Sequence, residues 1–359
     1  MGRVLMKGNE AIAEAAIRAG CLHFFGYPIT PQSEIPEYLS RRLPELGGCY
    51  VQSESEVATS HMIYGAAGVG TKVMTSSSSP GISLMAEGIS YLAGAELPVV
   101  IVNIMRAGPG LGGILPAQSD YAQTTRGMAH GDFRLIALAP ASVQEAVDLT
   151  ILAFDLAEKY RTPVILAGDG VIGQMMEPVV LPEATVGPPL KADDWALTGC
   201  VGRKPRKVSS MFLDPDELNA HNFKLKARFA EIARNETRFE AYACDEPLDL
   251  LVTSFGISAR ICRSAVDAAR SEGLKVGLFR PITISPFPMD ALREIIGRSQ
   301  RVLDVEMNTG QMLHDVEMAA QGRCPIDFFG RCGGLIPSAE GILEQIRASL
   351  AQLPKGGVP

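Results

Sequence analysis

Residues 49–75, CYVQSESEVATSHMIYGAAGVGTKVMT, form the stretch that decides the fold. The run Cys49–Gln52 predicts a strand, the run Glu56–Val69 a helix, and the run Lys72–Thr75 the following strand. Because apolar and small residues fill the helical run with almost no charge, we expect that helix to be packed on most sides. A strand, a helix and a strand in succession predict parallel strands with a helix against the sheet.

The same alternation of short apolar runs and helical runs continues on both sides of this stretch. Further strands are predicted at 22–27, 98–105, 133–139 and 162–167, and further helices at 31–43, 81–93 and 143–159. The alternation resumes with strands at 248–254, 275–279, 300–305 and 325–329 and helices at 258–271, 289–296 and 339–350. The fold class is therefore predicted to be α/β, with two parallel-sheet domains.

The alternation stops between these two parts. Residues 179–247 begin with several prolines, and a charged run at 222–240 predicts one exposed helix. We therefore divide the chain into a first α/β domain at 1–178, a linker and helical arm at 179–247, and a second α/β domain at 248–352.

Composition narrows the classes of function. A chain of 359 residues with 47% hydrophobic content suits two domains with ample cores. The net charge of −7 argues against a nucleic-acid-binding or membrane-surface protein and favours a small-molecule or protein partner. No run reaches the roughly 18 apolar residues of a membrane span, and the start lacks the pattern of a signal peptide. We expect a cytoplasmic protein.

Cysteine usage bears on metals and on the compartment. The seven cysteines are scattered, and no CxxC pair exists. The sequence therefore predicts no iron–sulfur, zinc or other metal site in this chain. In a reducing cytoplasm, buried free thiols are expected.

An acidic cluster, residues 53–56, opens the central helix, and Glu56 is its most informative member. In one interpretation these serines and glutamates only cap the helix and complement its dipole. In the other, Glu56 is a carboxyl group held in an apolar setting so that it exchanges a proton with a bound cofactor. Capping needs only one or two of the four residues, so both interpretations stay open.

Three loops follow predicted strands at the edge where parallel sheets bind ligands. Thr30 precedes Pro31, which steers it away from helical geometry, so it suits a helix cap or a hydroxyl contact to a ligand. Ser76–Ser79, before Pro80, suit the binding of an anion through backbone N–H groups. Arg106 ends a strand and precedes several glycines, so it suits a bidentate grip on a carboxylate, with a surface salt bridge as the alternative.

The residues around three other candidate motifs argue against the functions that those motifs would indicate. The glycines of residues 108–113 match the dinucleotide fingerprint, but Pro116 stands where a helix should already run, so we reject a nicotinamide site. Gly168–Gly170 resemble the start of the diphosphate and Mg²⁺ motif of thiamine enzymes, yet the asparagine that would close it is absent before Asn219. Asp169 is therefore predicted to be a turn residue. No serine or cysteine nucleophile shares a motif with a histidine.

Five strings resemble a known family when they are taken together and in order. They are GYPITP at 26–31, QSESEVA at 52–58, MRAGPGLG at 105–112, VGLFRPITISPFP at 276–288 and VEMNTGQM at 305–312. They look like the alpha subunit of 2-oxoacid:ferredoxin oxidoreductases, and the similarity spans essentially the whole chain. RAGPGLG is similar to the branched-chain type, which acts on 3-methyl-2-oxobutanoate (2-ketoisovalerate), whereas pyruvate and 2-oxoglutarate members more often carry an RGGPSTG-like string.

The resemblance implies a division of labour between subunits. The first domain would bind the aminopyrimidine of thiamine diphosphate, and the second would resemble the transketolase C-terminal domain. A beta subunit would supply the diphosphate and Mg²⁺ site, and gamma and delta (ferredoxin-like) subunits would carry iron–sulfur clusters. The implied reaction is coenzyme A-dependent oxidative decarboxylation of a 2-oxoacid to acyl-CoA and CO₂, with ferredoxin as the electron acceptor. The missing half-site and the absent cysteine motifs agree with this division.

The resemblance also implies roles for individual residues. Glu56, chosen over Glu54 by its spacing to Gly65, corresponds to the glutamate that hydrogen-bonds the pyrimidine and promotes its imino tautomer. Arg106 matches the position that binds the substrate carboxylate, and Thr30 lies near the reacting carbonyl. The other expected cofactor contacts are Tyr27, Pro28, Ile29, Ser78 and Pro80.

The substrate and the functional class of the protein each leave alternatives open. Leu111, Ile114 and Leu115 after Arg106 are apolar and favour an alkyl tail. A 2-oxoglutarate tail would leave a carboxylate buried without a cation unless Arg126 folds inward, and pyruvate is a further candidate. Two rivals come from other classes: a self-contained thiamine enzyme, which needs a full metal half-site, and a non-catalytic scaffold subunit, whose complex would turn over without Glu56 or Arg106.

Overall fold

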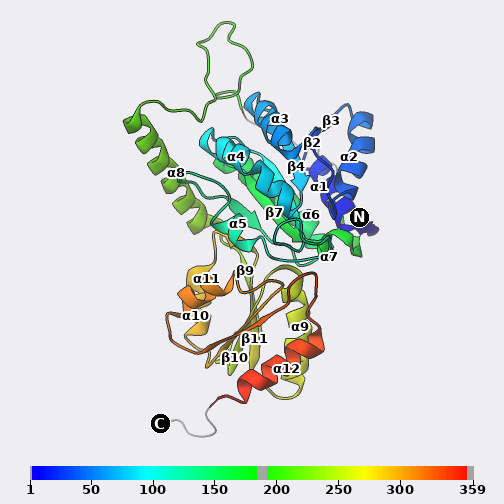
Figure 1. Cartoon of the computed structure of the whole chain (residues 1–359), viewed down its shortest axis with the longest axis vertical. Coiled ribbons are helices and arrows are strands. Elements are labelled where there is room, and N and C mark those ends of the chain that lie inside the picture. Colours follow the sequence, from blue (N-terminus) through cyan, green and yellow to red (C-terminus); the bar gives the residue numbers. More distant parts are fainter. Residues whose placement is uncertain (1, 184–191, 354–359) are drawn as a thin grey trace.

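A computed structural model describes residues 2–183 and 192–353 of the chain. Two lobes lie one above the other, and each is built around its own mostly parallel sheet (Figure 1). The helices within the described residues are α1 (Gly8–Arg18), α2 (Glu34–Glu45), α3 (Glu56–Gly68), α4 (Ser79–Gly94), α5 (Tyr121–Thr125), α6 (Val143–Tyr160), α7 (Gly170–Gln174), α8 (Pro215–Asn235), α9 (Gly256–Ser271), α10 (Met289–Ile296), α11 (Leu313–Ala320) and α12 (Ala339–Leu350).

The first lobe holds a seven-stranded sheet. Its order is β12 (Thr283–Ser285), β6 (Ile136–Leu138), β7 (Val164–Asp169), β5 (Val100–Met105), β4 (Val73–Ser77), β2 (His23–Gly26) and β3 (Cys49–Gln52). All neighbours are parallel except β12, which runs antiparallel to β6. The chain passes from β2 to β3 on one side and then to β4 on the other, so the loops after β2 and β4 diverge and leave room for a ligand.

Helices cover both faces of this sheet, which explains why every residue of β4, β5, β6 and β7 is buried. In β5 the side chain of Ile101 packs with α3 and α4, whereas those of Val100 and Val102 pack with α1, α2 and α6. Every residue of β5 is buried. The alternation of side chains along a strand therefore feeds two separate cores.

The second lobe holds a five-stranded sheet in the order β14 (Ile326–Gly330), β13 (Val302–Glu306), β10 (Leu250–Thr253), β11 (Val276–Pro281) and β9 (Phe239–Tyr242). Only β9 runs antiparallel to its neighbour. Helices α9 and α12 share one core on this sheet, while α10 and α11 belong to the core that continues into the first lobe. A small antiparallel pair, β1 (Val4–Lys7) with β8 (Met176–Val179), completes the described sheets.

The predicted α/β class is confirmed, but several elements differ from their predictions. Helix α2 begins at Glu34 rather than at residue 31, because Asn9 and Gln174 donate hydrogen bonds to the carbonyl of Pro31 and hold it outside the helix. The helix predicted at 222–240 is wrong at both ends, since α8 spans Pro215–Asn235. Strands β1 and β8 and helix α11 were not predicted.

Two strands cross the predicted domain limits. β9 lies in the segment assigned to the linker, yet it pairs with β11 of the second sheet. β12 lies in the segment assigned to the second domain, yet it pairs with β6 of the first sheet. The limits 1–178, 179–247 and 248–352 remain our proposal for how the chain divides, with this exchange of edge strands as a refinement.

Candidate active site

The three predicted loops meet at the carboxyl edge of the first sheet. Arg106 follows β5, and its guanidinium donates through Nη1 to the carbonyl of Thr30 at 3.0 Å. The backbone N–H of Arg106 donates to Oγ of Ser79 at 3.0 Å, at the start of α4. Thr30 and Arg106, which are 76 positions apart in the sequence, are thus joined by a direct hydrogen bond.

Arg106 is buried, with 6% of its surface exposed. Its second terminal nitrogen donates to the carbonyl of Leu111 at 3.1 Å, and its Nε has no partner among the described residues. The surface salt bridge considered as an alternative is therefore wrong. A guanidinium offers five N–H donors, so a buried one that spends two of them on carbonyls retains donors for a carboxylate.

Thr30 is exposed beside an open cleft of about 630 Å³. The cleft is also lined by Ile114, Leu115, Val171 and Met175, which makes its wall largely apolar. Because α2 starts only at Glu34, Thr30 does not cap that helix, and this alternative is wrong. Its hydroxyl is left for contact with a ligand or with solvent.

Glu56 begins α3 and is buried, with 6% of its surface exposed. The cap itself is Ser55, whose hydroxyl accepts from the N–H of Ala58 at 3.2 Å. Glu54 is exposed, whereas Glu56 has no hydrogen-bond partner among the described residues. Capping thus needs Ser55 only, and a buried carboxyl group without a partner is the kind of group that a ligand completes.

A glycine makes the space for this carboxyl group. A Cβ atom on Gly81, in the first turn of α4, would lie 2.7 Å from Oε1 of Glu56 and 2.1 Å from Oγ of Ser77. The hydroxyls of Ser77 and Ser78 are buried and have no partner in the described part of the chain. Two buried hydroxyls without a partner and the carboxyl group of Glu56 therefore lie together at the start of α4.

The remaining predicted cofactor contacts lie in the same two loops. Tyr27 and Pro28, after β2, are exposed and Ile29 is half-buried. Ser78 precedes α4 without capping it, and Pro80 lies in its first turn. All five are therefore near the edge where Glu56 and Arg106 lie, but none is fixed there by a side-chain hydrogen bond that the structure describes.

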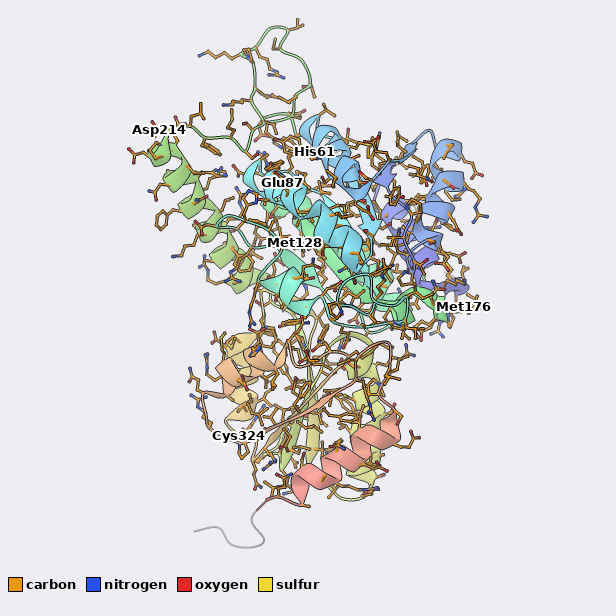
Figure 2. The ribbon with its side chains drawn as sticks, viewed as in Figure 1. His61, Glu87, Met128, Met176, Asp214 and Cys324 are labelled. Carbon is orange, nitrogen blue, oxygen red and sulfur yellow. The ribbon has the colours of Figure 1, made fainter. Side chains whose placement is uncertain are left out.

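The expectation that the central helix is packed on most sides is wrong. Val57 and Met62 of α3 are 45% and 37% exposed, and Leu84 of α4 is 55% exposed. His61 and Glu87 mark this outer surface on the two neighbouring helices (Figure 2). An apolar run in sequence cannot reveal whether its own chain covers it, and exposed apolar surface of this kind marks an interaction site.

A pocket of about 380 Å³ lies between the start of α4 and the second lobe. Ser79, Asp120, Asn308 and Cys332 are among its lining residues.

The cysteines match the expectation of buried thiols only in part. Cys21, Cys244 and Cys262 are buried, whereas Cys49 and Cys324 are half-buried and Cys200 and Cys332 are exposed. All seven are free.

Asp120 is a site residue that no sequence motif indicated. Its carboxylate accepts from Nδ2 of Asn103 at 2.9 Å. Burial raises the pKa of the Asp120 carboxyl, although hydrogen bonds from Ser79 and Asn103 and the positive charge of Arg106 oppose that rise. Residues 107–116 separate Asp120 from Arg106 along the chain, so the sequence did not indicate that the two lie close together.

Asp169 is not the turn residue predicted. It ends β7, is buried, and its Oδ1 accepts from the N–H groups of Val171 and Ile172 at 2.9 and 3.1 Å. Its other oxygen accepts from the N–H of Ile257 in the second lobe at 3.4 Å. Burial raises the pKa of this carboxyl to about 6. Asp169 therefore caps α7 and joins the two lobes.

Comparison with known proteins places this geometry in a family. The family described as pyruvate flavodoxin/ferredoxin oxidoreductase, thiamine diphosphate-binding, matches residues 14–206, and pyruvate:ferredoxin oxidoreductase core domain II matches residues 249–342. The chain is 49% identical to the ketoisovalerate oxidoreductase subunit VorB of Methanothermobacter thermautotrophicus, over 97% of its own length and 98% of that subunit. This chain belongs to the 2-oxoacid:ferredoxin oxidoreductase family. The predicted family is confirmed.

Other relatives place it within that family of oxidoreductases. Identity falls to 37% for the 2-oxoglutarate synthase subunit KorA of the same organism, over 95% of this chain and 97% of that subunit. The 2-oxoacid:ferredoxin oxidoreductase subunit is therefore of the ketoisovalerate type by similarity, and its relatives are subunits of larger enzymes.

Solved structures support the same fold. The chain aligns with a 2-oxoglutarate:ferredoxin oxidoreductase from Magnetococcus marinus, bound to 2-oxoglutarate, coenzyme A and succinyl-CoA, at a TM-score of 0.88 and 25% identity. The alignment covers 97% of this chain but only 65% of the Magnetococcus marinus chain. A split-gene transketolase matches at a TM-score of 0.59 and 12% identity, which shows a shared fold only. Among the described residues, no helix has the length and apolar character to cross a membrane.

Proposed function

We propose that this chain provides the aminopyrimidine side of the active site in an oxidoreductase that converts 3-methyl-2-oxobutanoate, coenzyme A and oxidised ferredoxin into acyl-CoA, CO₂ and reduced ferredoxin. The observation that carries the proposal is Glu56, a buried carboxyl group without a partner at the start of α3. Cytoplasmic location remains part of the proposal.

The residues around Glu56 fit thiamine diphosphate. When bound, the cofactor supplies a thiazolium that stabilises carbanion character at the decarboxylated carbon. Glu56 would hold a proton at a pyrimidine ring nitrogen and take part in its transfer, since general acid–base groups must lie within hydrogen-bond reach of the atom they serve. Gly81 keeps this contact open, because any side chain there would meet the Glu56 carboxyl group. Ser78 and Pro80, with Tyr27, Pro28 and Ile29, would border the ring.

Arg106 and Thr30 would orient the 2-oxoacid. The buried guanidinium has donors beyond the two that bind the carbonyls of Thr30 and Leu111, and burial strengthens an ion pair with a substrate carboxylate. The exposed hydroxyl of Thr30 lies beside the apolar cleft, where it can donate to the substrate carbonyl. A carboxylate held at one end and a carbonyl at the other fix the bond that breaks.

A partner subunit would complete the site. The exposed apolar surface of Val57, Met62 and Leu84 lies next to Glu56 on α3 and on α4. We propose that a beta subunit covers this surface and supplies the diphosphate and Mg²⁺ ligands, while gamma and delta subunits carry the iron–sulfur clusters that pass electrons to ferredoxin.

The surroundings of the site favour an alkyl side chain on the substrate. Leu111, Ile114 and Leu115 are exposed at the loop after Arg106, and Leu111 is 83% exposed. Arg126, the cation that a dicarboxylate would need, forms an ion pair with Asp315 of the second lobe. Tyr121 donates to the same carboxylate at 2.6 Å, so the Arg126 guanidinium is already paired with a carboxylate that the chain itself holds. An unpaired distal carboxylate would cost several kcal/mol.

The test of substrate class is a kcat/KM comparison of the purified complex on 3-methyl-2-oxobutanoate, pyruvate and 2-oxoglutarate. We expect the branched substrate to exceed 2-oxoglutarate by at least about a hundredfold, the ratio that a few kcal/mol produces. A preference for 2-oxoglutarate that Arg126→Ala abolishes would overturn the branched-chain proposal and leave the family unaffected.

The shared site has its own test. Calorimetry of the isolated chain with thiamine diphosphate and Mg²⁺ should show weak binding or none, and co-expression with the beta subunit should restore it. Tight Mg²⁺-dependent binding by this chain alone would overturn the shared site and favour a self-contained enzyme.

A further inference from the structure

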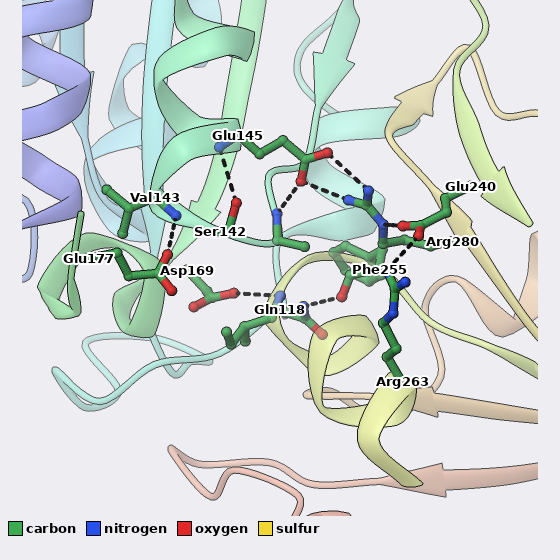
Figure 3. Close-up of polar contacts among 12 residues, drawn as sticks. Gln118, Ser142, Val143, Glu145, Asp169, Glu177, Glu240, Phe255, Arg263 and Arg280 are labelled. Atoms are coloured by element: carbon green, nitrogen blue, oxygen red, sulfur yellow. Dashed lines mark hydrogen bonds and ion pairs between the residues drawn. The ribbon is translucent and has the colours of Figure 1, made fainter. Parts of the chain in front are cut away.

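One segment, residues 117–126, follows the Arg106 loop and runs between the two lobes. Gln118 is the second residue of this segment and is fully buried. Its Nε2 donates to the carbonyl of Phe255 at 2.8 Å, and its Oε1 accepts from Oγ of Ser258 at 2.8 Å and from the N–H of Met307 at 3.1 Å. Figure 3 shows the Gln118 side chain reaching Phe255 at the junction.

The backbone of Gln118 binds the same lobe. Its N–H donates to the carbonyl of Met307 at 3.1 Å, and its carbonyl accepts from Nδ2 of Asn308 at 2.9 Å. Each of the five hydrogen bonds that Gln118 makes here therefore ends on the second lobe, although Gln118 belongs to a segment of the first.

The residues on either side of Gln118 turn back to Arg106. Pro116 forms a bridge with Arg106, and the N–H of Ala107 donates to the carbonyl of Leu115 at 3.0 Å. After Gln118, the carboxylate of Asp120 accepts from Asn103 in β5, three residues before Arg106. The loop that carries Arg106 is thus closed at its far end by a residue that the second lobe holds.

We propose that Gln118 is a positioning residue, through which the second lobe holds the Arg106 loop in the geometry that binds the substrate carboxylate. A buried amide that satisfies three polar groups is specific in direction, because a shift of the loop would leave those groups unpaired. The effect on substrate binding rests on the proposed function of Arg106, whereas the effect on the loop does not.

The junction offers a matched control on its other side. Glu145 of α6 accepts from both terminal nitrogens of Arg280 in β11, at 2.8 and 2.9 Å (Figure 3). This ion pair also joins the two lobes, but it is not part of the Arg106 loop. A variant at Glu145 therefore loosens the junction without reaching Arg106.

The experiment compares Gln118→Met, which keeps the shape and removes the three side-chain hydrogen bonds, with Glu145→Gln, both in the assembled complex. Hydrogen exchange of residues 106–117 should accelerate at least about tenfold in Gln118→Met and stay unchanged in Glu145→Gln. The KM for the 2-oxoacid should rise about tenfold in Gln118→Met with kcat nearly unchanged, the pattern of lost uniform binding. The KM for coenzyme A should not move.

A milder variant covers the case in which Gln118→Met fails to assemble. Ser258→Ala removes one donor to Gln118 and should shift exchange and KM in the same direction by less. Unchanged exchange at 106–117, or equal acceleration in Glu145→Gln, would overturn the inference. If exchange accelerates but KM does not rise, Arg106→Lys decides: a raised KM there overturns the role of Gln118 alone, and an unchanged KM overturns the proposed role of Arg106 as well.

Discussion

Two buried carboxyl groups of the first lobe lie at helix starts and have opposite surroundings. Asp169 at α7 accepts three backbone N–H groups, two from its own helix and one from Ile257 across the junction. Glu56 at α3 is also buried, but its helix is capped by Ser55 and no described group hydrogen-bonds its carboxyl. Both are acidic residues at the start of a helix, and in sequence they look alike.

The difference separates a structural carboxyl group from one that awaits a ligand. A buried polar group that the chain satisfies contributes to stability, whereas one left unsatisfied costs free energy until something binds it. We therefore expect variants at Asp169 to change stability and variants at Glu56 to change turnover. Four predictions test this contrast.

Glu56→Gln should give the largest effect. Gln is nearly isosteric but cannot transfer a proton, so kcat of the assembled complex should fall by about 10²–10⁴-fold while assembly is retained. Steady-state kinetics and size-exclusion chromatography measure the two properties. Glu54→Gln, at an exposed position two residues earlier, is the control and should have normal kcat. If Glu54→Gln lost activity and Glu56→Gln kept it, the assignment of proton transfer to Glu56 would be wrong.

Gly81→Ala should be next. The added methyl group would lie 2.1 Å from Oγ of Ser77 and 2.7 Å from Oε1 of Glu56, so both side chains must move and affinity for thiamine diphosphate should fall at least about tenfold. Calorimetry of the assembled complex measures this affinity. Gly68→Ala at the end of α3, where a Cβ meets no atom within 4 Å, should leave affinity unchanged and stabilise slightly. Equal effects of both variants would contradict the inference that Gly81 makes the space for the Glu56 carboxyl group.

Asp169→Asn should act on stability in a pH-dependent way. The folded pKa of Asp169 is raised from 3.8 to about 6, so its contribution to stability is present below about pH 4 and is lost as pH rises through about 6. Asn keeps an acceptor for Val171 and Ile172 without this titration. From pH 4.5 to 7 the variant should gain on the wild type by about 2 kcal/mol, because that window covers about 1.5 pH units of the shift.

Thermal unfolding of both complexes across that pH range measures the Asp169 effect. The difference in Tm between variant and wild type should shift in favour of the variant as pH rises, and kcat should stay close to normal. A difference in Tm that does not change with pH would show that Asp169 does not titrate between its two states as expected.

Ser55→Ala should give the smallest effect. Loss of the cap on α3 should cost about 1 kcal/mol of stability, since Ser55 alone accepts from Ala58. Turnover should remain within about twofold of wild type, because the proposed acid–base group is Glu56. A loss of kcat as large as that of Glu56→Gln would show that capping and catalysis cannot be separated here.

Local patterns in the sequence determined much of this protein. The central helix was predicted at 56–69 and spans Glu56–Gly68, because Ser55 and the small apolar residues after it are local signals. The alternating runs also determined the α/β class, and the order of the loops placed Thr30 and Arg106 at one edge of a parallel sheet. The choice of Glu56 over Glu54 agrees with their burial and exposure.

Tertiary structure alone decided the rest, because the deciding partners are distant in sequence. β9 became a strand by pairing with β11, and α8 ended before it, where Glu236 accepts from Lys159 and Tyr160. The outer face of α3 is apolar yet exposed, which hydrophobicity cannot distinguish from a buried face. Gln118 carries no motif, since its importance comes from five hydrogen bonds to another lobe, and such contacts exist only once the two lobes have come together.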